Sequence, residues 1–127
     1  MWYTNTMPYK DPEKKREAGR KSSLKYYYKN REAKMAYNRK YEQRVKDEVF
    51  NHYGGYICAC CGITHKVFLT IDHIHGGGSK HRKETGGGGK FNYRWIRKNN
   101  YPEGFQVLCW NCNCGRARNN DICPHKE

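Results

Sequence analysis

Two cysteine pairs decide the fold: CACCG at residues 58–62 and CWNC at residues 109–112. Two residues between cysteines let one tight turn point both thiolates at the same ion, and two such turns complete the four-thiolate shell typical of structural zinc. We therefore predict a zinc site with four ligands: Cys58, Cys61, Cys109 and Cys112. Cys60 is a less suitable ligand than Cys58, because its thiol and that of the adjacent Cys61 would reach one ion poorly.

The composition of the chain favours metal ligands over disulfides. Of the 127 residues only 36% are hydrophobic and 13 are glycine, so a core built from apolar burial alone would be small. The N-terminus has no apolar secretion segment, and no stretch approaches the roughly 18 to 20 apolar residues of a membrane span. These features predict a reducing, cytoplasmic compartment and no membrane partner, and thiols in such a compartment bind metal.

Three further cysteines and a histidine form a chemically adequate set for a second zinc ion, provided that the C-terminus folds back. This set consists of Cys60, Cys114, Cys123 and His125. The alternative is that they are leftover buried or exposed thiols without a metal. The sequence leaves both readings open.

A change in composition divides the chain at Gly54. Residues 1–53 are predicted to form a basic, largely helical arm, and residues 54–127 a zinc-bound domain. The arm is dense in charge and tyrosine, and it has no glycine after Gly19. Apolar residues recur every four positions up to Val49, so we expect the last turns of the helix to dock on the rest of the chain.

The net charge predicts a polyanionic partner, of which DNA is the favoured one. The chain carries 25 Lys and Arg against 12 Asp and Glu, a formal net charge of +13. In the arm, basic side chains are interleaved with tyrosines, which suits phosphate contacts backed by aromatic packing. The predicted contacts in the arm include Lys25, Lys29 and Arg31. The alternative is a solvated helix face with core tyrosines.

The predicted zinc-bound domain contains two short strands and a helix: residues 67–71 (VFLTI), 105–108 (FQVL) and 110–119. The first strand overlaps the start of LTIDHIHGGG at residues 69–78, a stretch that places an acid next to a histidine between the two cysteine pairs. Adjacent strand residues point to opposite faces. Asp72 and His73 can therefore cooperate only if the strand is irregular or if the groups that they act on lie on different sides.

These motifs resemble the HNH endonucleases of the ββα-metal class, in particular the phage-type branch that includes recombination endonuclease VII. There an Asp-His pair lies between two zinc-binding cysteine pairs. The resemblance covers residues 58 to about 119, through CACCG, LTIDHIHGGG and FQVLCWNCN. It implies a small α+β nuclease core and a metal-dependent hydrolase that cuts DNA phosphodiester bonds, with 5′-phosphate and 3′-hydroxyl ends as products. A phage-encoded enzyme would act in the cytoplasm of the host cell.

The resemblance also implies roles for three residues: His73 as general base, and Asp72 and Asn113 as ligands of a catalytic Mg²⁺ or Mn²⁺. Asn113 occupies the place of the final histidine of the motif. The middle asparagine has no match, because Gly104 stands at its position. Three other asparagines are candidates for supporting His73: Asn92, Asn99 and Asn100.

Residues 76–90 (GGGSKHRKETGGGGK) are predicted to be a flexible basic loop that moulds to a DNA backbone. Four side chains are placed to hold phosphates: Lys80, His81, Arg82 and Lys83. We expect Arg82 to lie nearest to the scissile group, whereas His75 either touches phosphate or packs the loop. A solvated linker is the alternative.

Two other functions fit the same residues. One is a nuclease that resolves Holliday junctions or other branched DNA, which would need a homodimer. The other is a zinc module that binds nucleic acid without cutting it, against which the Asp72-His73 pair argues.

Overall fold

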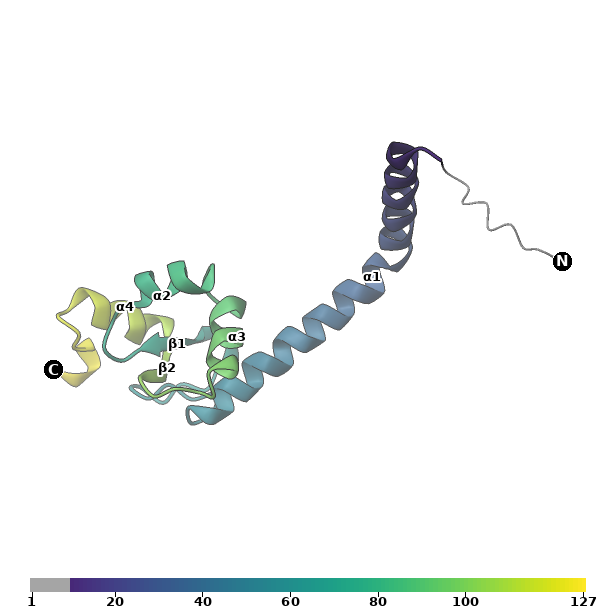
Figure 1. The fold of residues 1–127 in the computed structure, drawn as a ribbon. Helices are drawn as coiled ribbons and strands as arrows, with labels where there is room; N and C mark the ends of the chain where they lie inside the picture. The colour runs from purple at the N-terminus through teal and green to yellow at the C-terminus, as the bar shows by residue number, and fades with distance from the viewer. Residues whose placement is uncertain (1–9) are drawn as a thin grey trace. The chain divides into compact units, whose positions relative to one another are not determined.

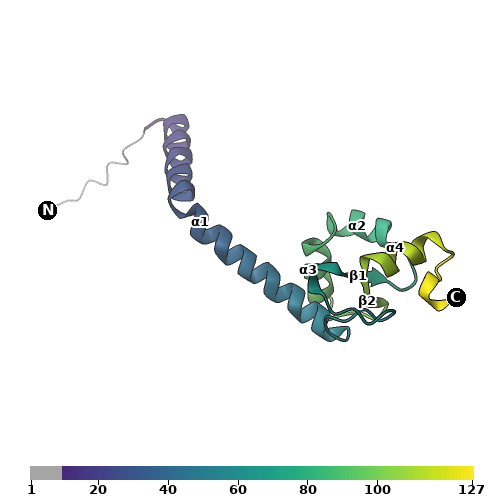
Figure 2. The same ribbon diagram turned by 180° about the vertical axis from the view of Figure 1, so that it is seen from behind.

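The computed structural model describes residues 10–127, and in this range the chain is α+β, with four α-helices and a two-stranded antiparallel sheet (Figures 1 and 2). Its contacts divide the chain into two compact units, one that ends at Lys40 and one that spans Tyr41–Glu127. The cysteine-rich unit thus begins before Gly54, where the composition changes. The reason is that the last turns of the first helix pack into this unit.

Helix α1 spans Pro12–His52, as the glycine-poor, charge-rich sequence predicts. Between Lys10 and Lys40 none of its side chains is buried. Tyr26, Tyr28 and Tyr37 are exposed by 70%, 67% and 68%, so these tyrosines are surface residues and not core residues. Despite its length α1 is too polar to cross a membrane, and no other helix within residues 10–127 is suited to do so.

The second unit builds its sheet and helices around the end of α1, where Val45, Val49 and Phe50 are fully buried. The elements that follow α1 are β1 (Leu69–His73), α2 (Gly78–Thr85), α3 (Lys90–Lys98), β2 (Phe105–Cys109) and α4 (Trp110–Arg118). The small apolar core consists of Phe50 with residues of the two strands, and it includes four buried cysteines: Cys58, Cys109, Cys112 and Cys123. Cysteine side chains therefore fill much of this small core.

Strand β1 begins at Leu69 and ends at His73, two residues later than predicted at each end. Residues Lys66–Phe68 form a 3₁₀ turn instead of the start of the strand. Asp72 and His73 consequently lie inside the strand, where they pair regularly with Gln106 and Phe105 of β2. Within the described chain β1 pairs with β2 alone, so its other edge carries no strand.

The prediction of a flexible loop over residues 76–90 is wrong, because Gly78–Thr85 forms helix α2. The six residues from Ser79 to Glu84 are not helix breakers, and the glycines lie at the two ends of the helix. Gly77 and Gly86 flank it with φ angles of 82° and 86°. These left-handed conformations favour glycine, so the glycines here begin and end a helix.

Candidate metal centre and catalytic pocket

The four predicted zinc ligands meet in the structure. The sulfur atoms of Cys58, Cys61, Cys109 and Cys112 all lie within 4.8 Å of one another. The Sγ atoms of Cys61 and Cys109 are 3.7 Å apart. A tetrahedral zinc site with Zn–S bonds of about 2.3 Å has sulfur–sulfur edges of about 3.8 Å. The cluster is therefore compatible with structural zinc.

Backbone N–H groups donate hydrogen bonds to two of these four sulfur atoms. The N–H groups of Cys61 and Cys109 donate to Cys58 Sγ over 3.5 and 3.3 Å, and the N–H of Cys112 donates to Cys109 Sγ over 3.4 Å. Burial raises the pKa of Cys58, but the amide donors outweigh it and bring the pKa to about 6. Burial and the neighbouring sulfurs raise the pKa of Cys112. A cation bound here would offset the repulsion among four thiolates and keep all four deprotonated.

Three of the four members of the predicted second set lie together in the structure. The ligand atoms of Cys60, Cys123 and His125 lie within 4.8 Å of one another, and the fourth member of the group is Cys112 instead of Cys114. Cys114 is exposed and belongs to neither group. Residues two positions apart on an α-helix are about 200° apart around its axis, so Cys112 and Cys114 of α4 face opposite sides.

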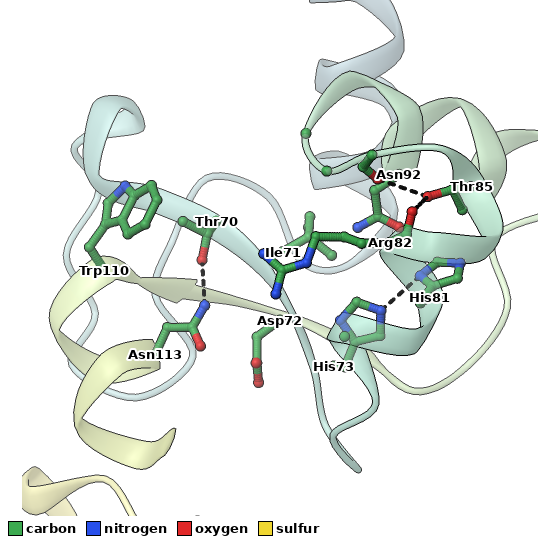
Figure 3. Close-up of a pocket in the computed structure, with 14 residues that line it drawn as sticks. Thr70, Ile71, Asp72, His73, His81, Arg82, Thr85, Asn92, Trp110 and Asn113 are labelled. Carbon is green, nitrogen blue, oxygen red and sulfur yellow. Dashed lines mark hydrogen bonds between the residues drawn. The ribbon is translucent and has the colours of Figure 1, made fainter. Parts of the chain in front are cut away.

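A cavity of about 330 Å³ lies along β1 and is lined by residues of β1, α2 and α4 (Figure 3). It brings together the three residues predicted to be catalytic, Asp72, His73 and Asn113. His81 and Arg82, which were predicted to hold phosphates, also line it. The other predicted phosphate contacts, His75, Lys80 and Lys83, are exposed and do not line the cavity.

Asp72 is held by two donors on one of its carboxylate oxygens. Its Oδ2 accepts from Arg116 Nη1 at 2.6 Å and from Gln106 Nε2 at 2.9 Å. The side chains of Arg116 and Asp72 are only 16% and 14% exposed, and Arg116 also donates to the carbonyl oxygen of Ile74. Oδ1 of Asp72 has no hydrogen-bond donor in the part of the chain that the structure describes. The sequence did not reveal Arg116 or Gln106 as partners of Asp72.

Asn113 is oriented by a short chain of hydrogen bonds. Its Nδ2 donates to Thr70 Oγ1 at 3.2 Å, and this hydroxyl donates to the carbonyl oxygen of Leu108 at 3.0 Å. The amide nitrogen is therefore occupied. The amide oxygen has no donor among the described residues, and Figure 3 shows it on the side of Asp72.

His73 is fixed by a second histidine. Its Nε2 lies 2.8 Å from Nδ1 of His81, and its ring packs on Phe105 with centroids 4.8 Å apart. The other nitrogen, Nδ1, faces the cavity in Figure 3. A Cβ at Gly78 would lie 3.3 Å from Nδ1, so the glycine leaves this nitrogen open. Burial and then the neighbouring His81 lower the pKa of His73, against the opposite effect of Asp72, and this favours the neutral ring at neutral pH.

The side chains of Asp72 and His73 have partners on two different helices, although the two residues are adjacent in a regular strand. Asp72 is bonded to Arg116 of α4, whereas His73 is bonded to His81 of α2. The cavity reaches both side chains because α2 and α4 both contribute to its lining at this strand. The strand is therefore regular at this pair, and both residues line the cavity without an irregularity.

Of the three asparagines considered as supports for His73, Asn92 alone lines the cavity. It is 8% exposed, and its Oδ1 has no hydrogen-bond partner among the described residues. Asn99 and Asn100 are exposed. The hydrogen-bond partner of His73 is nevertheless His81.

Comparisons of the chain with protein-family models, with curated proteins and with solved structures find no match. The geometry and chemistry of the two cysteine groups and of the cavity therefore carry the functional interpretation.

Proposed function

We propose that this chain is a metal-dependent DNA endonuclease of the HNH type. The observation that carries the proposal is the single cavity lined by a carboxylate, an amide oxygen and an imidazole, those of Asp72, Asn113 and His73. The presence of β1, β2 and α4 in this chain order supports a ββα-metal core. Zinc at the neighbouring cysteines would hold β2 and the start of α4 in register, because Cys109 ends the strand and Cys112 lies in the first turn of the helix.

The oxygen atoms that remain free suit a hard divalent cation. Asp72 Oδ1 and Asn113 Oδ1 are the ligands that we propose, and such oxygens favour Mg²⁺ or Mn²⁺ over zinc. With one carboxylate, and with Arg116 beside it, we expect the cation to bind weakly until DNA phosphate and water complete its shell. Bound there, it would neutralise charge on the scissile phosphate and on the leaving oxygen.

His73 is the proposed general base. Its Nδ1 faces the cavity and takes a proton from the attacking water, while its Nε2–H donates to His81 Nδ1 and fixes the required tautomer. The lowered pKa keeps the ring neutral before it accepts the proton. Attack on phosphorus opposite the 3′ oxygen leaves a 5′-phosphate and a 3′-hydroxyl.

Arg82 and α1 supply the proposed contacts with DNA. Arg82 is exposed, lines the cavity and is placed to bind a non-bridging phosphate oxygen. On α1 the side chains of Lys25, Lys29 and Arg31 are exposed beside exposed tyrosines. Phosphate contacts backed by aromatic side chains are sequence-tolerant, and they suit a chain with a net charge of +13.

The test is nicking of supercoiled plasmid DNA by the zinc-loaded chain. We expect nicks with Mg²⁺ or Mn²⁺ and none when the divalent cation is omitted. We also expect DNA ligase to reseal the nicks, because the proposed ends are 5′-phosphate and 3′-hydroxyl. Absence of cation-dependent nicking by a chain that still shifts DNA in a gel would overturn the proposal and favour the non-catalytic zinc module.

His81 gives a more specific prediction about the positioning of the base. We expect His81→Ala to lower the nicking rate by roughly 10- to 100-fold, the usual cost of losing the partner that orients a reactive histidine. His81→Asn should recover part of the rate, because its amide oxygen can accept from His73 Nε2 where His81 Nδ1 did. Equal rates for the two variants in single-turnover assays, at matched DNA binding, would contradict this role.

A further inference from the structure

The second group of metal-ligand side chains has the dimensions of a zinc site. Nδ1 of His125 lies 3.4 Å from Cys112 Sγ and 3.5 Å from Cys123 Sγ. With Zn–S bonds of about 2.3 Å and Zn–N bonds of about 2.0 to 2.1 Å, the S–N edge of a tetrahedron is about 3.6 Å. Cys60 completes this group, with its sulfur within 4.8 Å of the other three ligand atoms.

Cys112 belongs to both groups and is completely buried between them. A thiolate has enough lone pairs to bind two cations at once. We propose that the chain binds two zinc ions that share the Cys112 thiolate. The first is held by Cys58, Cys61, Cys109 and Cys112, and the second by Cys60, Cys112, Cys123 and His125.

This arrangement gives the adjacent residues Cys60 and Cys61 separate ions. Neighbouring thiols reach one ion poorly, and the structure sorts the pair accordingly. Cys61 lies with Cys109, at an S–S distance of 3.7 Å, and Cys60 lies with Cys123 and His125. Every cysteine of CACCG then has a ligand role.

The C-terminal segment is built to approach α4 closely. A Cβ at Gly115 would lie 3.0 Å from Pro124 Cδ, so the absence of a side chain there lets Pro124 pack against the helix. The residues on either side of Pro124 are the two ligands, Cys123 and His125. A turn in which the N–H of Ile122 donates to the carbonyl oxygen of Asn119 returns the chain to this position.

Apolar packing alone does not account for the position of this segment. From Asn119 to Glu127 the single buried residue is Cys123, and the neighbouring Ile122 is 52% exposed. A metal ion that links Cys123 and His125 to Cys112 would supply the missing stabilisation.

The charges balance when the second ion binds. Zn²⁺ displaces one proton from each thiol of Cys60 and Cys123, and it takes neutral His125 and the existing Cys112 thiolate as its other ligands. Two positive charges enter and two protons leave. The two-ion cluster thus has the same net charge as the four-thiolate site alone, so the second ion adds no net charge to this small core.

Native mass spectrometry of the intact chain tests the number of ions. We expect two zinc ions in the wild type and in Cys114→Ser, and one in Cys123→Ser and in His125→Ala. Cys114 is the matched control, because it is exposed and lies outside both groups. One zinc ion in the wild type, or two in Cys123→Ser, would overturn the proposal. Circular dichroism of Cys123→Ser should retain the helix signal, since the first site keeps all four of its ligands.

Cadmium NMR tests the shared thiolate. In the chain loaded with ¹¹³Cd we expect two resonances, one from a four-sulfur site and one from a site with three sulfurs and one nitrogen. They should be split by scalar coupling through the common sulfur of Cys112. Two resonances without this coupling would overturn the shared ligand.

Discussion

Replacing His73 with alanine is expected to lower the rate of cation-dependent DNA nicking by about 10²- to 10⁴-fold, the usual contribution of a general base. His73 is the proposed base because its Nδ1 faces the cavity, whereas Nδ1 of His81 is directed at His73. The carboxylate of Asp72 is paired with Arg116, and the pKa of His73 is shifted downward by burial and by His81. The measurement is a single-turnover rate on supercoiled plasmid with saturating Mg²⁺.

His75→Ala is the matched control for this variant. His75 lies two residues further along the chain, is exposed, and does not line the cavity, so its loss should leave the rate within about twofold of the wild type. Both variants should bind DNA equally, because neither histidine is needed for the basic contacts of α1. If His73→Ala nicks DNA as fast as His75→Ala does, the base is not His73 and the proposed mechanism fails.

The residues that the sequence grouped as the structure does are those whose grouping follows from short spacings. Two residues between cysteines bring both thiols to one ion whatever the rest of the fold does, and both pairs occupy one cluster in the structure. Asp72 and His73 are adjacent in one strand, and the cavity along this strand is lined by both. At these positions the spacing along the sequence was sufficient to predict which side chains lie together.

The partners of these residues depend on tertiary structure, and the sequence could not assign them. Gln106 reaches Asp72 because the two residues are opposite in the antiparallel register, and a one-residue shift would have placed another side chain there. Arg116 lies three residues after Asn113, about one turn further along α4, so the spacing predicts that these two residues share one face of the helix. Nothing in the spacing indicated that this face covers Asp72.

The incorrect predictions have different causes. Residues 76–90 were predicted to be a loop because of their glycines, although those glycines lie at the ends of α2. Cys114 was grouped with Cys123 by cysteine count, although the helical repeat turns Cys114 away from Cys112. At α2 the bounds of the helix had to be known first, whereas the helix predicted over residues 110–119 already contained both Cys112 and Cys114.

Replacing Cys109 with serine is expected to unfold the second unit. A structural zinc ion contributes on the order of 10 to 16 kcal/mol in small zinc-stabilised domains, whereas the net stability of a domain is about 5 to 15 kcal/mol. Cys109 is buried at the junction of β2 and α4. It is one of the four cysteines in the buried core. If zinc binds here as proposed, the apolar residues that remain are too few to compensate for its loss.

Thermal unfolding followed by near-ultraviolet circular dichroism, which reports the packing of the aromatic side chains around Phe50, is the measurement for this prediction. We expect no cooperative transition in Cys109→Ser and an unchanged transition in Cys114→Ser, whose sulfur lies outside both groups. A chelator should abolish the transition of the wild type, and added Zn²⁺ should restore it. The same addition should not restore Cys109→Ser, because that variant lacks a ligand and not merely the ion. A wild-type chain that keeps its transition after complete removal of zinc would show that apolar packing suffices and that the cysteine cluster does not stabilise the fold.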